Sequence, residues 1–150
     1  MKPRQTAALA ARLLVGAVLV FAAAPKATAP AEEFAVVISA YDVLPSSMTL
    51  PMAGLLPWLE LLLGWALILG VSARGACAAA GALFGLFLAA LASTIVKRIP
   101  LPSCGCFGGA VHLTALQAFL FDSAMIGLCR LAYLGGPGPL SLDGWSELGL

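Results

Sequence analysis

The residues of this sequence with the clearest chemical potential are two cysteines separated by a single glycine, Cys104-Gly105-Cys106. Prolines and glycines surround them over residues 102–109, and this composition predicts a tight, non-helical turn. A disulfide across one intervening residue closes a very small ring, so we expect the bond to be strained and readily reduced. The spacing therefore indicates a pair that exchanges disulfides with other thiols.

Basic surroundings favour reactive cysteines at this position. Lys97 and Arg98 precede the pair and the N-terminal end of a predicted helix follows it, and both features stabilise a thiolate. Three other roles stay open: a static disulfide, two unpaired thiols, or a metal site completed by His112. Three soft ligands are fewer than the four of a structural zinc site, although copper(I) needs fewer. We assign no metal ligands on this basis.

Two carboxylates within apolar segments are the next candidates, because ionisable residues inside a membrane are costly and mark functional sites. Glu60 and Asp122 fall at similar depths from the outer ends of their segments. Carboxylates at one level can share a proton, or one can pair with a basic residue near the bundle mouth. We expect these two to relay protons in a redox reaction or to orient a cysteine. The alternative is a structural contact that fixes helix register.

Two further cysteines have a different character. Cys77 and Cys129 fall towards the cytoplasmic ends of their segments, where a disulfide is improbable. Buried cysteine behaves as a small apolar residue, so we predict that both pack in the interior. Asp122 and Cys129 are about two helical turns apart and share one helix face, so Asp122 faces the interior if Cys129 does.

Two tryptophans lie in the same apolar segment as Glu60. Trp58 follows Pro57 in the outer third, a position typical of a membrane-interface anchor. Trp65 lies deeper, and we expect it to pack inside the bundle.

The elements that must position these residues are membrane helices. The chain has 150 residues, of which 61% are hydrophobic and 10% charged, and its mean hydropathy is +1.02. A soluble domain is about 45–50% apolar and about 25% charged, and a short chain cannot hide so much apolar surface from water. The net charge is only +1 with no basic patch, which argues against nucleic-acid binding. The environment we expect is a lipid bilayer.

Four segments reach the length of about 20 mostly apolar residues that a membrane span needs. They predict an all-α integral membrane four-helix bundle with helices over 7–24, 51–71, 76–96 and 111–134. Together these form one membrane domain over residues 1–134. Residues 135–150 open with a glycine- and proline-rich run that cannot continue a helix, so we expect a flexible C-terminal tail.

Two stretches leave alternatives open. Residues 32–44 carry Phe34, Val37, Ile38 and Tyr41 at helical spacing, which fits either an interfacial helix on the bundle mouth or a packed loop. Residues 1–29 read as a retained helix or as a cleaved signal peptide with a basic start and a small-residue cleavage site.

Small residues repeat every four positions in the third segment. This spacing lets helix backbones approach closely in lipid, which favours packing within the bundle and leaves a homodimer as the alternative. The repeat consists of Cys77, Gly81, Gly85, Ala89 and Ser93.

Lysines and arginines in the short flanks set the expected orientation. Their distribution favours a cytoplasmic position for both termini, although Lys97 and Arg98 oppose it. On this reading Cys104 and Cys106 lie on the outer, oxidising side of the membrane.

Several motifs in chain order resemble the MauE/DoxX-like membrane protein family, the group that includes the methylamine utilisation protein MauE. The resemblance covers about residues 9–134, and its most specific element is the Cys-Gly-Cys-Phe-Gly signature. The matching motifs are Arg12-Leu13-Leu14-Val15-Gly16 with Ala24-Pro25-Lys26, Tyr41-Asp42-Val43-Leu44-Pro45, Leu56-Pro57-Trp58-Leu59-Glu60, Gly70-Val71-Ser72-Ala73-Arg74 and Cys104-Gly105-Cys106-Phe107-Gly108.

The resemblance implies a four-helix protein of the inner (cytoplasmic) membrane that helps to mature methylamine dehydrogenase, whose exported small subunit is rich in disulfides. The family's architecture is similar to the bundles of DsbB and vitamin K epoxide reductase, which implies a quinone as electron acceptor. We place that quinone near Glu60, Asp122 and Trp58. Those enzymes use Cys-x-x-Cys and a second shuttle pair, whereas this chain has Cys-x-Cys alone. Phe121 also precedes Asp122 where the family often has a basic residue.

Three functional hypotheses follow. In the main one, Cys104 and Cys106 accept electrons from an extracytoplasmic thiol–disulfide protein or an exported client and pass them to the quinone, with Glu60 and Asp122 assisting. In the second, the chain is a non-enzymatic assembly factor for a redox partner, and the cysteines only staple the bundle mouth. In the third, it handles a metal or a small solute through Cys104, Cys106 and His112.

Overall fold

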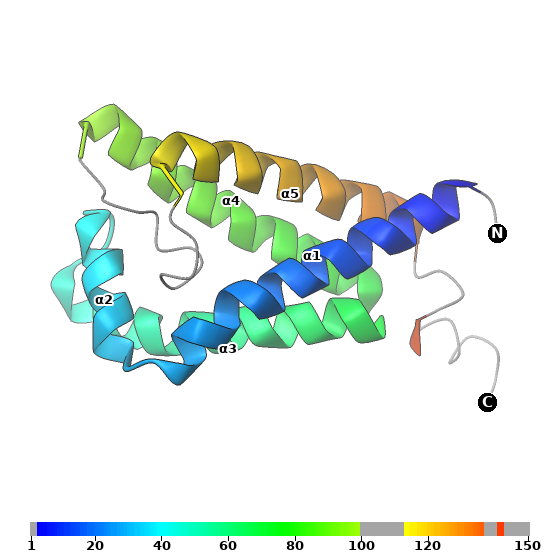
Figure 1. Cartoon of the computed structure of the whole chain (residues 1–150), viewed down its shortest axis with the longest axis horizontal. Helices are drawn as coiled ribbons and strands as arrows, with labels where there is room; N and C mark the ends of the chain where they lie inside the picture. The colour runs from blue at the N-terminus through cyan, green and yellow to red at the C-terminus, as the bar shows by residue number, and fades with distance from the viewer. Residues whose placement is uncertain (1–2, 100–112, 137–140, 143–150) are drawn as a thin grey trace.

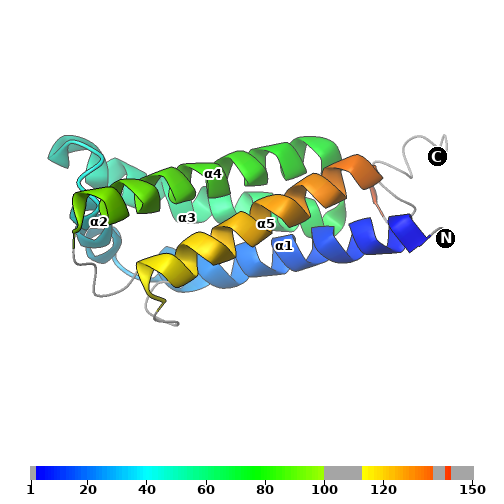
Figure 2. The same cartoon turned by 90° about the horizontal axis from the view of Figure 1, so that it is seen from above.

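The computed structural model describes residues 3–99, 113–136 and 141–142. Within these ranges all regular secondary structure is helical, and there is no strand. Four long helices run lengthwise beside one another, and a short helix lies across one end of them (Figures 1 and 2). The helices are α1 (Pro3–Thr28), α2 (Ala31–Ala40), α3 (Ser46–Leu69), α4 (Ala73–Lys97) and α5 (Ala115–Gly135).

The four long helices are long and apolar enough to cross a membrane. The spans are Arg4–Thr28, Ser46–Leu69, Ala73–Lys97 and Ala115–Gly135, with 21 to 25 residues each. A bilayer core requires about 20 residues, so each of these helices can cross it. The prediction of an all-α protein with four membrane helices is confirmed, and the chain is a multi-pass membrane protein.

The short helix decides between the two readings of residues 32–44. The first part of this stretch is helical in α2, Ala31–Ala40, which crosses the end of the bundle (Figure 1). The helix ends earlier than the hydrophobic spacing suggested, because Asp42 adopts a left-handed φ of 50° that a helix cannot contain. Residues 41–45 then return the chain to α3.

The helix boundaries differ from the predicted ones where capping decides them. Helix α3 begins at Ser46 rather than 51 and continues through Pro51 and Pro57, which membrane helices tolerate. It ends at Gly70, whose left-handed φ of 70° is typical of a helix C-terminus.

The fourth membrane helix begins later than predicted. Leu113 and Thr114 are not helical, and α5 starts at Ala115. Thr114 and Gln117 form a reciprocal capping box: the Thr114 hydroxyl accepts the Gln117 N–H at 3.3 Å, and the Gln117 side chain accepts the Thr114 N–H at 3.0 Å. The first two residues of the predicted helix, 111 and 112, lie outside the described residues.

All four long helices contribute to the larger of two buried apolar clusters in the described part of the bundle. One face of each helix points inward, while many large apolar side chains on the opposite faces remain exposed, as a bilayer environment requires. The buried members of the cluster are Ala11, Val15, Leu19, Leu63, Leu67, Ala76, Cys77, Ala80, Leu83, Phe84, Met125, Cys129 and Ala132.

A close helix contact joins α1 and α3 through two glycines. A Cβ atom on Gly16 would lie 2.9 Å from the carbonyl oxygen of Gly64, and a Cβ on Gly64 would lie 2.9 Å from that of Gly16. The two backbones therefore approach closely only because both side chains are absent. The repeat predicted on α4 is looser: a Cβ on Gly81 would make an ordinary 3.6 Å contact with Cys129, and one on Gly85 would meet nothing within 4 Å.

One described residue of the C-terminal tail is packed rather than free. Ser141 is buried, and a Cβ placed on Gly70 would come within 2.5 Å of the Ser141 Cβ and 3.0 Å of the Arg12 guanidinium. The tail therefore touches the turn between α3 and α4 at this point. For residues 137–140 and 143–150, which lie outside the described residues, flexibility stays a prediction.

A glycine substitution tests the α1–α3 contact. Gly64→Ala should lower the free energy of unfolding by about 1–3 kcal/mol, because the new methyl group has to displace backbone atoms of α1. Gly85→Ala is the matched control, since it adds the same atom to a mid-helix glycine facing open space. Unfolding in mixed detergent micelles, followed by circular dichroism, measures both. Equal losses for the two variants would contradict the assigned contact.

Candidate functional site

An ion pair inside the bundle is the central feature of the candidate site. The Lys26 Nζ lies 2.7 Å from Glu60 Oε2 and donates a hydrogen bond to Oε1 at 2.9 Å. The two side chains are only 2% and 1% exposed. The prediction that a buried carboxylate pairs with a basic residue near the bundle mouth is confirmed for Glu60. Lys26, which ends the first apolar segment, is part of the interior.

The position of α2 explains why Lys26 is buried. Lys26 lies in the last turn of α1, and the chain turns at Pro30 into α2, which folds over that end. The Phe34 ring of α2 then faces the lysine, with its centroid 5.1 Å from Nζ. The ammonium group thus has a carboxylate on one side and an aromatic face on the other, and both compensate for the loss of water.

The second predicted carboxylate lies close to this pair. Asp122 and Glu60 line the same small cavity, of about 20 Å³, between α1, α3, α4 and α5. A cavity of this volume has room for one water molecule. The structure therefore brings the two carboxylates together, as their similar predicted depths implied. The cavity is otherwise enclosed by apolar side chains, namely Val18, Leu19, Ala22, Phe84, Phe87 and Phe121.

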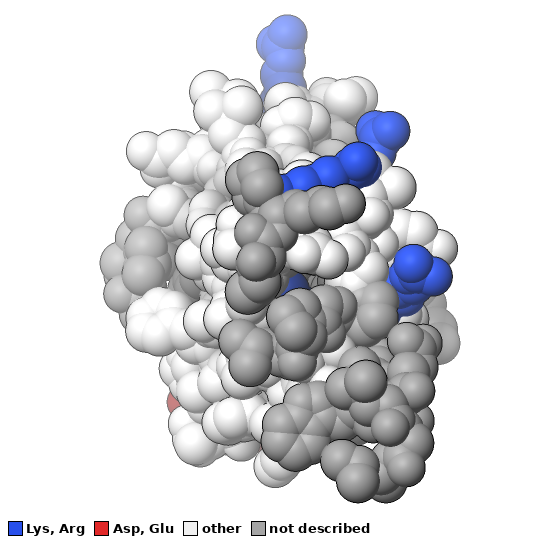
Figure 3. All heavy atoms as spheres, turned by 90° about the vertical axis from the view of Figure 1, so that its right-hand side faces the viewer, with Lys and Arg blue, Asp and Glu red and all other residues white. Residues whose placement is uncertain are grey.

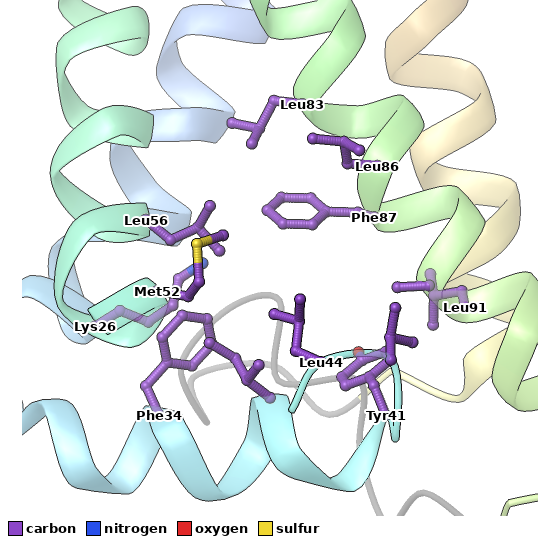
Figure 4. A pocket seen from close by; sticks show the side chains of 13 residues that line it. Lys26, Phe34, Tyr41, Leu44, Met52, Leu56, Leu83, Leu86, Phe87 and Leu91 are labelled. Atoms are coloured by element: carbon purple, nitrogen blue, oxygen red, sulfur yellow. The ribbon is translucent and has the colours of Figure 1, made fainter. Parts of the chain in front are cut away.

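A larger pocket of about 230 Å³ lies between α2, α3 and α4 (Figure 4). In the figure α2 closes one end, and the Phe87 ring points from α4 across the space towards Leu56 on α3. Phe87 lines both this pocket and the carboxylate cavity, so it separates the two. The pocket is lined by Lys26, Phe34, Ile38, Tyr41, Val43, Leu44, Met52, Leu56, Leu83, Leu86, Phe87, Ala90 and Leu91.

The tryptophans of α3 do not contribute to either cavity. Trp58, a predicted cofactor contact, is 63% exposed and absent from both linings. Its outward position fits a membrane-interface anchor. Trp65 is also more than half exposed, so the expectation that it packs inside the bundle is wrong. A tryptophan facing lipid costs nothing in a membrane protein, which is why depth alone does not predict its orientation.

The two cysteines of the helices are structural. Cys77 and Cys129 are buried free thiols within the same apolar cluster of α4 and α5. The prediction that they pack in the interior is confirmed, and Asp122 shares their inward-facing side.

The signature cysteines, Cys104 and Cys106, lie outside the described residues, as does His112. The described chain on either side of them ends beside the larger pocket. Lys97 Nζ, at the end of α4, donates to the Asp42 carbonyl oxygen at 2.7 Å and lies 3.1 Å from the Asp42 carboxylate. Leu113, before α5, packs against the small cluster of Leu91 and Ala118, as does Tyr41, and both Leu91 and Tyr41 line the pocket.

Metal ligands do not gather in the described part of the chain. Within residues 3–99, 113–136 and 141–142, no group of three or more His, Cys, Asp or Glu side chains is placed to hold a metal ion. The hypothesis of a metal site at Cys104, Cys106 and His112 concerns residues outside these ranges.

Comparison with known proteins gives the family. A family model described as Methylamine utilisation protein MauE matches residues 4–135, which contain all four membrane helices. This chain belongs to the MauE family. Among relatives of the MauE family, the Methylamine utilization protein MauE of Methylophilus methylotrophus is 34% identical over 142 residues, covering 94% of this chain and 73% of that protein. No solved structure matches the chain, so the resemblance to the DsbB and vitamin K epoxide reductase bundles stays a prediction.

Sequence reasoning missed Lys26 as the partner of Glu60, and Tyr41 and Phe87 as pocket residues. A signal for Lys26 was present: a carboxylate within a membrane span needs a counter-ion, and Lys26 ends the neighbouring apolar segment. No comparable signal distinguishes Phe87 from the other aromatic residues of α4, because its role depends on the gap that α2 closes.

A double-mutant cycle tests the ion pair. Lys26→Met or Glu60→Met alone leaves the other charge buried and uncompensated, so each should cost about 3–5 kcal/mol of stability. The double variant should recover most of this loss, because no charge remains to be buried. Thermal unfolding in detergent measures all three.

The exposed pair of Lys97 and Asp42 is the matched control for this cycle. Its side chains are 45% and 78% exposed, so Lys97→Met should cost at most about 1 kcal/mol. A single Lys26 or Glu60 variant as stable as the Lys97 variant would show that the buried pair does not form.

Proposed function

We propose that this MauE-family protein is a membrane thiol–disulfide redox protein that supports disulfide formation in exported proteins during methylamine utilisation. The proposed client is methylamine dehydrogenase or an extracytoplasmic thiol protein that serves it. Membership of a methylamine utilisation family and the Cys104-Gly105-Cys106 motif support this role.

The proposed reaction has two steps, disulfide exchange with the client and reoxidation of the cysteine pair. A thiolate of the client attacks the Cys104–Cys106 disulfide, and a mixed disulfide forms. The second client thiol resolves it, which leaves the client oxidised and the pair as two thiols that have gained two electrons and two protons. The pair is then reoxidised by passing two electrons and two protons to a lipid-soluble acceptor of the quinone class.

The position of the helix ends beside the cysteine motif is the main support for this proposal. The helix ends that flank the cysteine motif meet the same end of the bundle as the larger pocket and the buried ion pair. Leu113, just before α5, packs against the cluster of Leu91 and Ala118, and the pocket residue Tyr41 packs against the same cluster. A redox pair in this segment would lie within reach of a membrane-soluble acceptor and of groups that exchange protons.

The proposed orientation places both termini in the cytoplasm and the cysteine motif outside. Figure 3 views the bundle from the end that carries the N-terminus, and Lys and Arg side chains gather there. Arg4, Arg74 and Arg130 are exposed. At the other end the exposed basic residues are fewer, namely Lys97 and Arg98, and Lys97 lies 3.1 Å from the Asp42 carboxylate. This asymmetry favours a cytoplasmic position for the basic end, in the inner membrane.

The redox state of the pair in native membranes tests the proposal. We expect Cys104 and Cys106 to be oxidised at rest and to become thiols when the quinone pool is held reduced, because reoxidation then stops. Differential alkylation followed by mass spectrometry measures this. Cys77 and Cys129, which are buried free thiols, provide internal controls and should not change. A Cys104–Cys106 pair that keeps one state under both conditions would refute electron transfer.

Cysteine substitutions separate the three hypotheses. In a redox enzyme, one of the two variants Cys104→Ser and Cys106→Ser should accumulate a mixed disulfide with the client, visible on a non-reducing gel, because the cysteine that bonds to the client remains and the other is removed. An assembly factor would keep its function in the Cys104→Ser/Cys106→Ser double variant. A metal handler would lose bound copper or zinc in that variant, and metal analysis of the purified protein reports this.

A further inference from the structure

We infer that the pocket between α2, α3 and α4 binds the ring of a neutral, quinone-class membrane lipid, with Lys26 as the hydrogen-bond donor to a ring carbonyl. This inference rests on the proposed function, because it names the site of the lipid-soluble acceptor. The sequence-based placement put the acceptor near Glu60, Asp122 and Trp58; of these, Trp58 does not line the pocket, and Glu60 is reached through Lys26.

The size and chemistry of the pocket define the ligand. Its volume of about 230 Å³ lies below the range of about 300–1,000 Å³ for pockets that enclose a drug-sized molecule. It therefore suits one substituted ring rather than a whole lipid. Aliphatic and aromatic side chains make up almost all of the wall, with only Lys26 and Tyr41 bearing polar groups. A flat apolar ring with few acceptors matches this wall.

The pocket is accessible from the bilayer. Leu86 lines it and is 68% exposed, and Val43 lines it and is also exposed, so the wall continues onto the lipid-facing surface. A ligand can enter sideways from the membrane and leave a long apolar tail among the lipid chains. A water-soluble ligand would have no such apolar route.

Charge excludes an anionic ligand such as a fatty acid. Lys26 is the one cation in the pocket wall, and its charge is already balanced by Glu60 at 2.7 Å. A bound carboxylate would leave a net negative charge in a low-dielectric interior, which is costly. A neutral carbonyl can still accept a hydrogen bond, because the lysine ammonium has three donors and Glu60 supplies two oxygens. The pair therefore selects a neutral acceptor.

The two polar residues stand on opposite sides of the space. In Figure 4 Lys26 and Phe34 close one side, and Tyr41 lies with Leu91 on the other. A para-quinone carries its two carbonyls at opposite ends of the ring, so one can face the lysine and the other the tyrosine hydroxyl. This arrangement favours a ring with two carbonyls over an apolar chain, which has no acceptor to offer either residue.

Phe87 is the wall that the pocket shares with the carboxylate cavity. Behind it lie Glu60 and Asp122. Two-electron reduction of a quinone also takes up two protons, which the two thiols of the proposed dithiol donor release. In this proposal the two carboxylates lie on the path of these protons. Lys26 connects the carboxylates to the ring carbonyl, because it contacts Glu60.

A binding measurement on the purified full-length protein tests this site. A short-tailed ubiquinone analogue is titrated into the protein in nanodiscs, and its affinity is followed by calorimetry. Ala90→Phe fills the pocket from α4 and should weaken binding at least tenfold. Ala89→Phe is the matched control: it adds the same ring to the adjacent exposed residue, outside the lining, and should leave the affinity unchanged.

Three further measurements complete this test. A photoreactive quinone on the wild-type chain should label pocket residues of α3 or α4, which does not depend on any variant folding. The Cys104→Ser/Cys106→Ser variant should bind as the wild type does, so binding is tested apart from redox activity. An alkyl-tail analogue without the ring should not compete. Labelling outside the pocket, equal effects of the two Ala variants, or full competition by the tail would overturn the inference, the last by showing an acyl-chain site.

Discussion

A charged side chain inside a bilayer-spanning bundle is tolerated only when an opposite charge meets it, and this requirement organises the end of the bundle that α2 covers. Lys26 and Glu60 satisfy each other at 2.7 Å, from helices adjacent in the bundle but separated in the chain by α2. The pairing fixes the register of α1 against α3. It also explains α2, whose Phe34 ring covers the ammonium group. The larger pocket exists because α2 bridges this end of the bundle.

The ion pair alone would not bring the two helices close enough. Gly16 and Gly64 let the backbones of α1 and α3 approach deeper in the bundle, one helical turn from Glu60 along α3 and nearly three turns from Lys26 along α1. Electrostatic and steric constraints therefore act on the same helix pair. Helices α3 and α4, in contrast, leave between them the space that Phe87 divides into the pocket and the carboxylate cavity.

The sequence predicted the features that depend on composition and spacing. The four spans, the burial of Cys77 and Cys129, and the inward position of Asp122 follow from hydropathy and helical period, and the structure confirms them. The features that depend on neighbours were missed. In the sequence Lys26 has the position of a flanking residue, and only the placement of α2 over it shows that it is buried. Trp65 has the depth of a buried residue, and only the helix face on which it lies shows that it is exposed. The chemistry of Cys104 and Cys106 stays a prediction, because it rests on the motif and the family.

The unequal lengths of the helices make the thickness of the membrane part of the site. Helix α5 has 21 residues and extends about 32 Å, close to a hydrocarbon core of about 30 Å. Helices α3 and α4 have 24 and 25 residues and extend about 36–38 Å, so they must tilt to bury their apolar length. Both of them line the larger pocket. A change in the acyl-chain length of the surrounding lipids alters their tilt, and with it the width of the opening between them.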